Sequence, residues 1–213
     1  MKVLILSGPN HGFERSAPVI HQFLNATDDL DVILEDQKAI LTSGLDAFDV
    51  CVFGTGFTHP VRQNGGPVKW ESELNPAQED ALFDFVRGGK GLVGIHGTGW
   101  NIGERAVGLL GGHANWHPPG LTFTVNIAVG DHPITEGLDD FEVEDEIYMS
   151  AWFPEIEIIA TAQWADKPQP MAWTKSYGDG RVFYTALGHG PDTFTRPGMQ
   201  QLMAQGIRWA GGN

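Results

Sequence analysis

The sequence has little of what several large classes of protein require. Its single cysteine, Cys51, excludes an intramolecular disulfide and a cysteine-rich zinc site. Its 13 basic residues stand against 27 acidic ones, and the formal charge of −14 disfavours nucleic acids and anionic membranes as partners. No apolar stretch is long enough to span a bilayer, and the short run after Met1 lacks a signal-peptide cleavage site. We therefore expect a cytoplasmic protein.

What the chain does contain is an alternation of short apolar runs and amphipathic segments. Its 213 residues, 41% hydrophobic, suit a single domain over residues 1–213, because no repeat or long linker divides them. Strand-like runs lie at residues 3–6, 32–34, 50–53 and 91–95. Helical spacing begins near Ser16, and again at Asn75 in a segment that ends at Arg87. Short links between such units favour a mostly parallel sheet covered by helices on both faces.

The alternation is interrupted between residues 111 and 150. Residues 122–127 alternate like a half-exposed strand, and residues 141–148 are acidic and extended. We interpret this part as an inserted antiparallel excursion. Further strands are predicted at residues 155–162, 171–174 and 181–187, with a closing helix over residues 199–209.

A functional site is most clearly indicated by the stretch GLVGIHGTGW at residues 91–100. A predicted strand leads into His96, and the glycines on both sides permit a sharp turn into a helix. α/β hydrolases hold a nucleophilic serine at such a turn. A histidine there is suited to binding a metal or to acting as a general base, although it could also simply hydrogen-bond a loop.

Half of the eight histidines lie in the loops directly after predicted strands: His11, His59, His96 and His189. Ligands of open parallel sheets bind at the carboxyl ends of the strands, so this pattern predicts a site at that edge. Two further histidines, His113 and His117, would share one face of a helix, but the prolines that follow disfavour that helix.

Acidic and aromatic residues accompany these histidines. The acidic run at residues 142–146 is either a solvated edge or a source of site carboxylates. The aromatic side chains expected near the same edge would either stack on a sugar ring or pack in the core. They are Phe57, Trp100, Trp116 and Trp152.

Several motifs together resemble the trehalose-utilisation, ThuA-like family. They are GIH at 94–96, GGHANWHP at 111–118, HPIT at 132–135, DEIY at 145–148 and GRVFYTALGH at 180–189. The resemblance extends over nearly the whole chain. It implies a flavodoxin-like three-layer α/β/α sandwich similar to class I glutamine amidotransferases.

By that analogy, His96 occupies the position of the amidotransferase cysteine and His189 that of its histidine, with Asp192 near the third member of the triad. Cys51 cannot replace the missing nucleophile, because it belongs to a different predicted strand. We therefore expect no glutamine amidotransferase activity.

The resemblance implies a role in carbohydrate metabolism, with a small-molecule carbohydrate as the partner. We expect an enzyme of hydrolase or lyase type acting on a disaccharide or keto-sugar derivative. The predicted catalytic residues are His96, His189 and Glu146. The predicted substrate-binding residues are His11, His59, Trp100, Trp116 and Asp192.

A divalent metal, zinc first among them, is expected on His96, His113, His117 and His189. It would activate a water or polarise a keto-sugar carbonyl. No nucleotide cofactor is expected, and a homo-oligomer is compatible with the sequence. Two alternatives stay open: acid–base catalysis without a metal, and a non-catalytic sugar-binding or regulatory protein on the amidotransferase-like scaffold.

Overall fold

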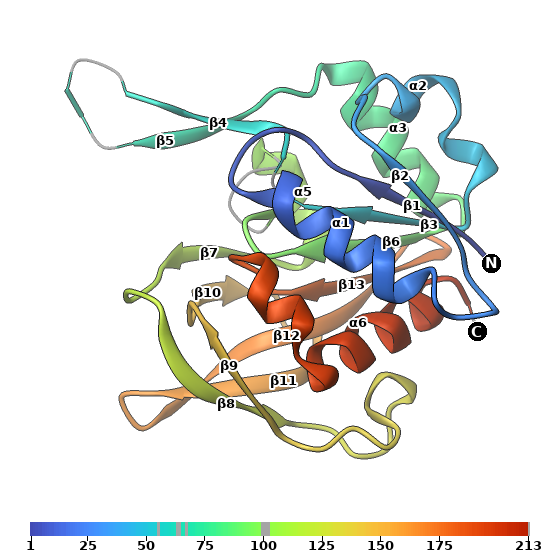
Figure 1. The fold of residues 1–213 in the computed structure, drawn as a ribbon. Helices are drawn as coiled ribbons and strands as arrows, with labels where there is room; N and C mark the ends of the chain where they lie inside the picture. The colour runs from blue at the N-terminus through green and yellow to red at the C-terminus, as the bar shows by residue number, and fades with distance from the viewer. Residues whose placement is uncertain (55, 63–64, 67, 99–102, 213) are drawn as a thin grey trace.

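The computed structural model describes residues 1–54, 56–62, 65–66, 68–98 and 103–212, and in this part of the chain a mixed sheet lies between two layers of helices (Figure 1). Its strand order is β2-β1-β3-β6-β13-β12-β11-β8-β9. The expected three-layer α/β sandwich is confirmed.

One half of the central sheet is parallel. It contains β1 (Lys2–Leu6), β2 (Asp31–Glu35), β3 (Val50–Phe53), β6 (Gly91–Ile95) and β13 (Gly180–Thr185). Strands β3 and β6 are buried along their whole length, as their continuous apolar runs require in a sheet covered on both faces. The carboxyl ends of β1, β6 and β13 lead into the loops that carry His11, His96 and His189.

The other half is antiparallel and consists of β12 (Lys167–Tyr177), β11 (Glu157–Trp164), β8 (Leu121–Ile127) and β9 (Phe141–Asp145). The expected excursion therefore divides in two. Strands β8 and β9 extend the edge of the central sheet, whereas β7 (Gly112–Trp116) and β10 (Met149–Trp152) form a separate antiparallel pair. Because His113 lies in a strand, the helical arrangement of His113 and His117 is excluded.

Helices α1 (Phe13–Leu24) and α6 (Pro197–Ala210) cover the face of the sheet toward the viewer in Figure 1, and α3 (Pro76–Arg87) and α5 (Gly103–Leu110) cover the other. The predicted bounds of α3 are confirmed, since Asn75 and Gln78 form a capping box and Gly88 follows the last residue. Helix α1 begins three residues before the expected Ser16, which is buried inside it.

The remaining elements are short. They are α2 (Ile40–Ser43), the 3₁₀ turns η1 (Leu45–Ala47), η2 (Pro133–Thr135) and η3 (Pro191–Thr195), and a hairpin of β4 (Thr58–Val61) and β5 (Lys69–Ser72). The hairpin projects away from the sheet in Figure 1. None of the described helices has the length and apolar character needed to cross a membrane.

Candidate functional site

His96 lies at the predicted strand-to-turn junction, in a left-handed backbone conformation with φ of 47°. Three hydrogen bonds hold it there. Its backbone N–H donates to Thr185 O at 2.7 Å, its carbonyl accepts from the Tyr184 hydroxyl at 2.7 Å, and its ring Nδ1 lies 2.7 Å from Ala186 O. Since a carbonyl only accepts, Nδ1 carries the proton, and Nε2 is left with a lone pair facing the site.

The second ring nitrogen of His96 meets three other polar groups. Its Nε2 accepts from the Tyr148 hydroxyl at 2.7 Å and lies 3.3 Å from His189 Nδ1 and 3.5 Å from Glu146 Oε2. Burial of the ring, which is 2% exposed, lowers the pKa of His96 to about 3. An imidazole that weak as a base stays neutral at physiological pH and is better suited to binding a metal than to taking a proton.

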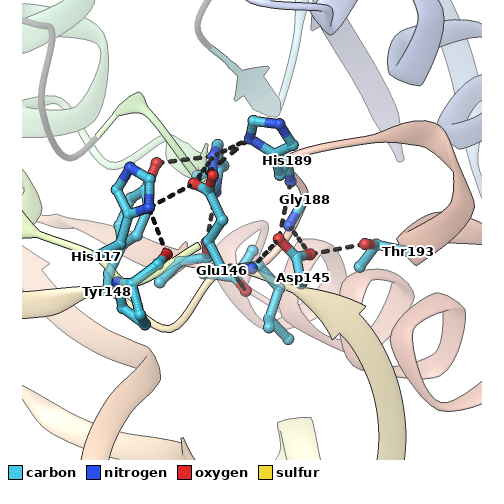
Figure 2. A network of polar contacts seen from close by, with 12 residues as sticks. His117, Asp145, Glu146, Tyr148, Gly188, His189 and Thr193 are labelled. Atoms are coloured by element: carbon cyan, nitrogen blue, oxygen red, sulfur yellow. Dashed lines mark hydrogen bonds and ion pairs between the residues drawn. The ribbon is translucent and has the colours of Figure 1, made fainter. Parts of the chain in front are cut away.

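Glu146 directly follows β9 and is placed among imidazoles (Figure 2). Its Oε2 lies 3.4 Å from His117 Nδ1 and 3.4 Å from His189 Nδ1. Burial acts to raise the pKa of Glu146, but the hydrogen bond from His189 and the charges of the histidines outweigh it and the pKa is lowered. In turn, the hydrogen bond to Glu146 raises the pKa of His189. The carboxylate is thus held in its ionised form.

His11 completes a group of three histidines at the carboxyl ends of the parallel strands. Its ring centroid lies 5.8 Å from that of His96 and 6.1 Å from that of His189. One nitrogen from each of the three rings lies within 4.8 Å of the other two. Burial, together with the charge of His189, lowers the pKa of His11, which favours the neutral form that metals bind.

Asp145 lies beside this cluster and is 4% exposed. Its carboxylate accepts hydrogen bonds from the backbone of Gly188 and His189 and from the Thr193 hydroxyl, all from the loop that follows β13 (Figure 2). Burial raises the pKa of Asp145 even though these hydrogen bonds oppose it. The sequence motif DEIY contained both Asp145 and Tyr148, but no local pattern showed that they contact His189 and His96.

A cavity of about 480 Å³ opens beside the cluster. Glu146 and His189 line it, and so does the predicted substrate-binding residue Asp192 of η3. Its remaining walls are mostly polar: Gly120, Glu144, Asp145, Gly190, Thr193, Thr195 and Arg196. A polar ligand therefore has room to reach Glu146 and His189.

Two of the predicted histidines have their described contacts elsewhere. His59 lies on β4 and pairs with Glu73 at 3.5 Å, and Glu73 in turn accepts from Asn10, the neighbour of His11. His113 faces Ala151 of β10 in the strand register. The group of histidines arranged to hold a metal thus combines His96 and His189 with His11, which the sequence had suggested for substrate binding.

The aromatic residues expected near the site fall into different environments. Phe57 is buried against Phe53 and packs in the core. Trp116 and Trp152 are exposed on the β7–β10 pair, and the Trp116 ring centroid lies 6.4 Å from that of Trp164. Trp100 lies outside the described residues.

The mixed sheet between two helical layers and the histidine at a strand-to-turn junction define an α/β protein with an amidotransferase-like fold. Cys51 is buried in β3, and burial raises the pKa of its thiol to about 12, so it does not serve as a nucleophile. Residues 2–210 match the model of the ThuA family, described as trehalose utilisation, and the chain belongs to that family. The description of the family, trehalose utilisation, indicates a role in carbohydrate metabolism.

Solved structures share this fold at low sequence identity. A ThuA-like protein from Bacteroides uniformis has a TM-score of 0.76 and 20% identity, with 99% of this chain and 91% of that one covered. One from Parabacteroides merdae has a TM-score of 0.75 and 18% identity over 99% and 89%. A GMP synthase protein from Thermoplasma acidophilum has a TM-score of 0.60 and 12% identity over 98% and 92%. No curated protein matches the sequence.

Proposed function

We propose that the protein is a metal-dependent enzyme of carbohydrate metabolism, of hydrolase or lyase type, that acts on a disaccharide or keto-sugar derivative. The observation that carries the proposal is the convergence of His11, His96 and His189, whose nitrogens lie within 4.8 Å of one another beside the ionised carboxylate of Glu146. Membership of the ThuA family supplies the carbohydrate part of the proposal.

One nitrogen from each of the three histidines is placed to bind zinc, and a bound ion would replace the hydrogen bonds of His96 Nε2 with Tyr148 and of His189 Nδ1 with Glu146. Two ligands of a tetrahedral zinc ion, each at its usual bond length, lie about 3.4 Å apart. His96 Nε2 and His189 Nδ1 lie 3.3 Å apart. The ring of His96 is also oriented through its other nitrogen by a backbone carbonyl, as metal-binding histidines commonly are. A zinc ion held there would supply a Lewis acid for a carbonyl or a water.

Glu146 is the proton acceptor in this proposal, because it is the ionised carboxylate next to the histidines. In a hydrolysis, Glu146 takes one proton from water as the water oxygen bonds to the anomeric carbon. The glycosidic bond breaks, and its oxygen takes the proton that Glu146 removed from the water, which restores the carboxylate. In a lyase reaction, Glu146 instead takes a proton from the carbon next to a carbonyl. The electron pair of that C–H bond forms a carbon–carbon double bond as the bond from the next carbon to the leaving oxygen breaks, and that oxygen takes the proton from Glu146.

The cavity supports a carbohydrate as substrate. Its volume of about 480 Å³ lies within the range of small-molecule sites, and its carboxylates, hydroxyls and Arg196 match the hydroxyl groups of a sugar. Asp192 lines this cavity, which agrees with the substrate-binding role proposed for it.

The test combines metal analysis with an assay. Purified protein is analysed for bound metal and incubated with trehalose, other disaccharides and their 3-keto derivatives, with product formation measured. Glu146→Gln should lower turnover by about 100-fold or more while zinc binding persists. Glu142→Gln, an exposed glutamate on the same strand β9, is the matched control and should retain activity. Sugar binding in calorimetry, without bound metal and without product, would contradict the proposal and identify a binding protein.

A further inference from the structure

The carboxylate of Asp145 joins two segments that the sheet itself does not join. Strand β9, which ends at Asp145, lies four places from β13 in the strand order. No ladder of backbone hydrogen bonds therefore connects β9 to the loop after β13 in the described structure. Instead, Asp145 Oδ2 accepts from the Gly188 N–H at 2.8 Å and from the Thr193 hydroxyl at 2.7 Å.

The other carboxylate oxygen, Oδ1, accepts hydrogen bonds from the backbone of two residues of the proposed site. Asp145 Oδ1 accepts from the backbone N–H of Glu146 at 2.8 Å and from the backbone N–H of His189 at 3.2 Å. A single oxygen atom thus fixes the backbone of the proposed proton acceptor and of a proposed metal ligand. Their side chains meet at 3.4 Å, between Oε2 and Nδ1.

We propose that Asp145 is a positioning residue that sets the metal affinity of the site by anchoring His189 against Glu146. This inference rests on the proposed function for the identity of the ligand. Asp145 is not one of the three potential metal ligands. Its effect on the metal therefore passes through the backbone of residues 188–189. Groups that orient metal ligands in this way commonly alter metal affinity when they are replaced.

The substitution Asp145→Asn tests the anchor at nearly constant shape. All four partners of Asp145 are hydrogen-bond donors, and three of them are backbone N–H groups that cannot accept. An asparagine offers one acceptor oxygen and places an NH₂ group against the remaining donors. At least one backbone N–H of the anchored segments then loses its partner, and the loop after β13 is released.

The experiment is a titration with Co²⁺, whose visible absorption reports the binding of histidine nitrogens without any need for turnover. Asp145→Asn should bind Co²⁺ about 10-fold more weakly than wild type, with a changed absorption spectrum. Asp140→Asn is the matched control, because Asp140 also accepts a backbone N–H, that of Ile127 at 2.7 Å, at the other end of β9. Its Co²⁺ affinity should equal that of wild type.

A second pair of variants covers the case in which Asp145→Asn does not fold. Thr193→Val removes one hydrogen bond to Asp145 Oδ2 and should weaken Co²⁺ binding, by less than Asp145→Asn does. Thr193→Ser keeps the hydroxyl and should keep the wild-type affinity. Unchanged affinity in Asp145→Asn, or in Thr193→Val where the former is unfolded, would overturn the anchoring role while leaving the metal site intact.

Failure of the proposed function has a different signature. If wild type bound no Co²⁺, the metal assignment would be wrong, and amide hydrogen exchange would then decide the role of Asp145. Release of the loop predicts faster exchange at Gly188 and His189 in Asp145→Asn than in wild type. Equal exchange rates at both amides would overturn the inference on that branch as well.

Discussion

Two histidines of the site lie in a backbone conformation that side chains seldom adopt. The φ angle is 47° at His96 and 59° at His11. Such left-handed residues cost free energy and persist where surrounding contacts hold them, often at functional positions. At His96 the holding contacts are the bonds to Thr185, Ala186 and Tyr184. The left-handed turn directs the ring over the carboxyl end of β6, toward Glu146 and His189.

The first prediction concerns the substitution His96→Asn. Asparagine tolerates the left-handed backbone, so the turn should survive while the metal-binding nitrogen is lost. Zinc binding and turnover should both disappear. The lost hydrogen bond to Ala186 should lower the free energy of unfolding by about 1–2 kcal/mol, measured by urea denaturation. His21→Gln, in helix α1, should leave both functions unchanged. Full turnover in folded His96→Asn protein would exclude His96 from the reaction.

At the scale of elements, local pattern sufficed for the parallel half of the sheet. Strands such as β3 and β6 are short apolar runs, and each is bounded by residues that break or turn the chain. The turn at His96 was predictable for the same reason, since a strand-like run ends there between glycines. The position of these histidines at one edge followed from the parallel arrangement alone.

The antiparallel half could be predicted only in part. Strand β7 was obscured by the helical spacing of His113 and His117, and the β4–β5 hairpin lies in a polar stretch without clear alternation. The grouping of Asp145 and Tyr148 with the histidines depends on contacts of β9, and of the segment after it, with the loops after β6 and β13. Contacts between residues so far apart in the sequence leave no periodic pattern. The sequence therefore left two readings of the acidic run open, a solvated edge or a source of site carboxylates.

The second prediction concerns the ion pair that joins α6 to the turn before β2. Arg208 donates two hydrogen bonds to Asp29, at 2.7 and 2.9 Å, and these lower the pKa of Asp29 to about 2. Because the pKa is lower in the folded state, the pair stabilises the protein above pH 3.8, and this stabilisation is lost as the pH falls through about 2. Both side chains are partly exposed, so solvent limits the gain to about 1 kcal/mol.

Urea unfolding of wild type and Arg208→Gln at several pH values measures this effect. The difference in unfolding free energy should be present at pH 7 and shrink between pH 4 and pH 2. Asp29→Asn should reproduce the loss at pH 7, and the double variant should lose no more than either single variant. A difference that stays constant down to pH 2 would show that Arg208 acts through some other contact.

At the scale of the whole molecule, the site joins the two halves of the fold. The loops after parallel strands supply His11, His96 and His189. The antiparallel part supplies Glu146 after β9 and Tyr148 before β10. A metal bound to the three histidines would fix loops from three strands at once, and it would bind the folded chain far better than the unfolded one. Zinc should therefore stabilise the whole domain and not only the loops that hold it.

The third prediction follows from this linkage. Free zinc at 100 times its dissociation constant should add about 2.7 kcal/mol to the free energy of unfolding. For a domain of this size, that corresponds to a rise in melting temperature of roughly 5–10 °C, which scanning calorimetry can measure and a chelator should reverse. Glu146→Gln should keep the rise, since Glu146 is assigned as proton acceptor, whereas His96→Asn should lose it. Loss of the rise in Glu146→Gln would instead make Glu146 a ligand, and a rise retained in His96→Asn would place the zinc elsewhere.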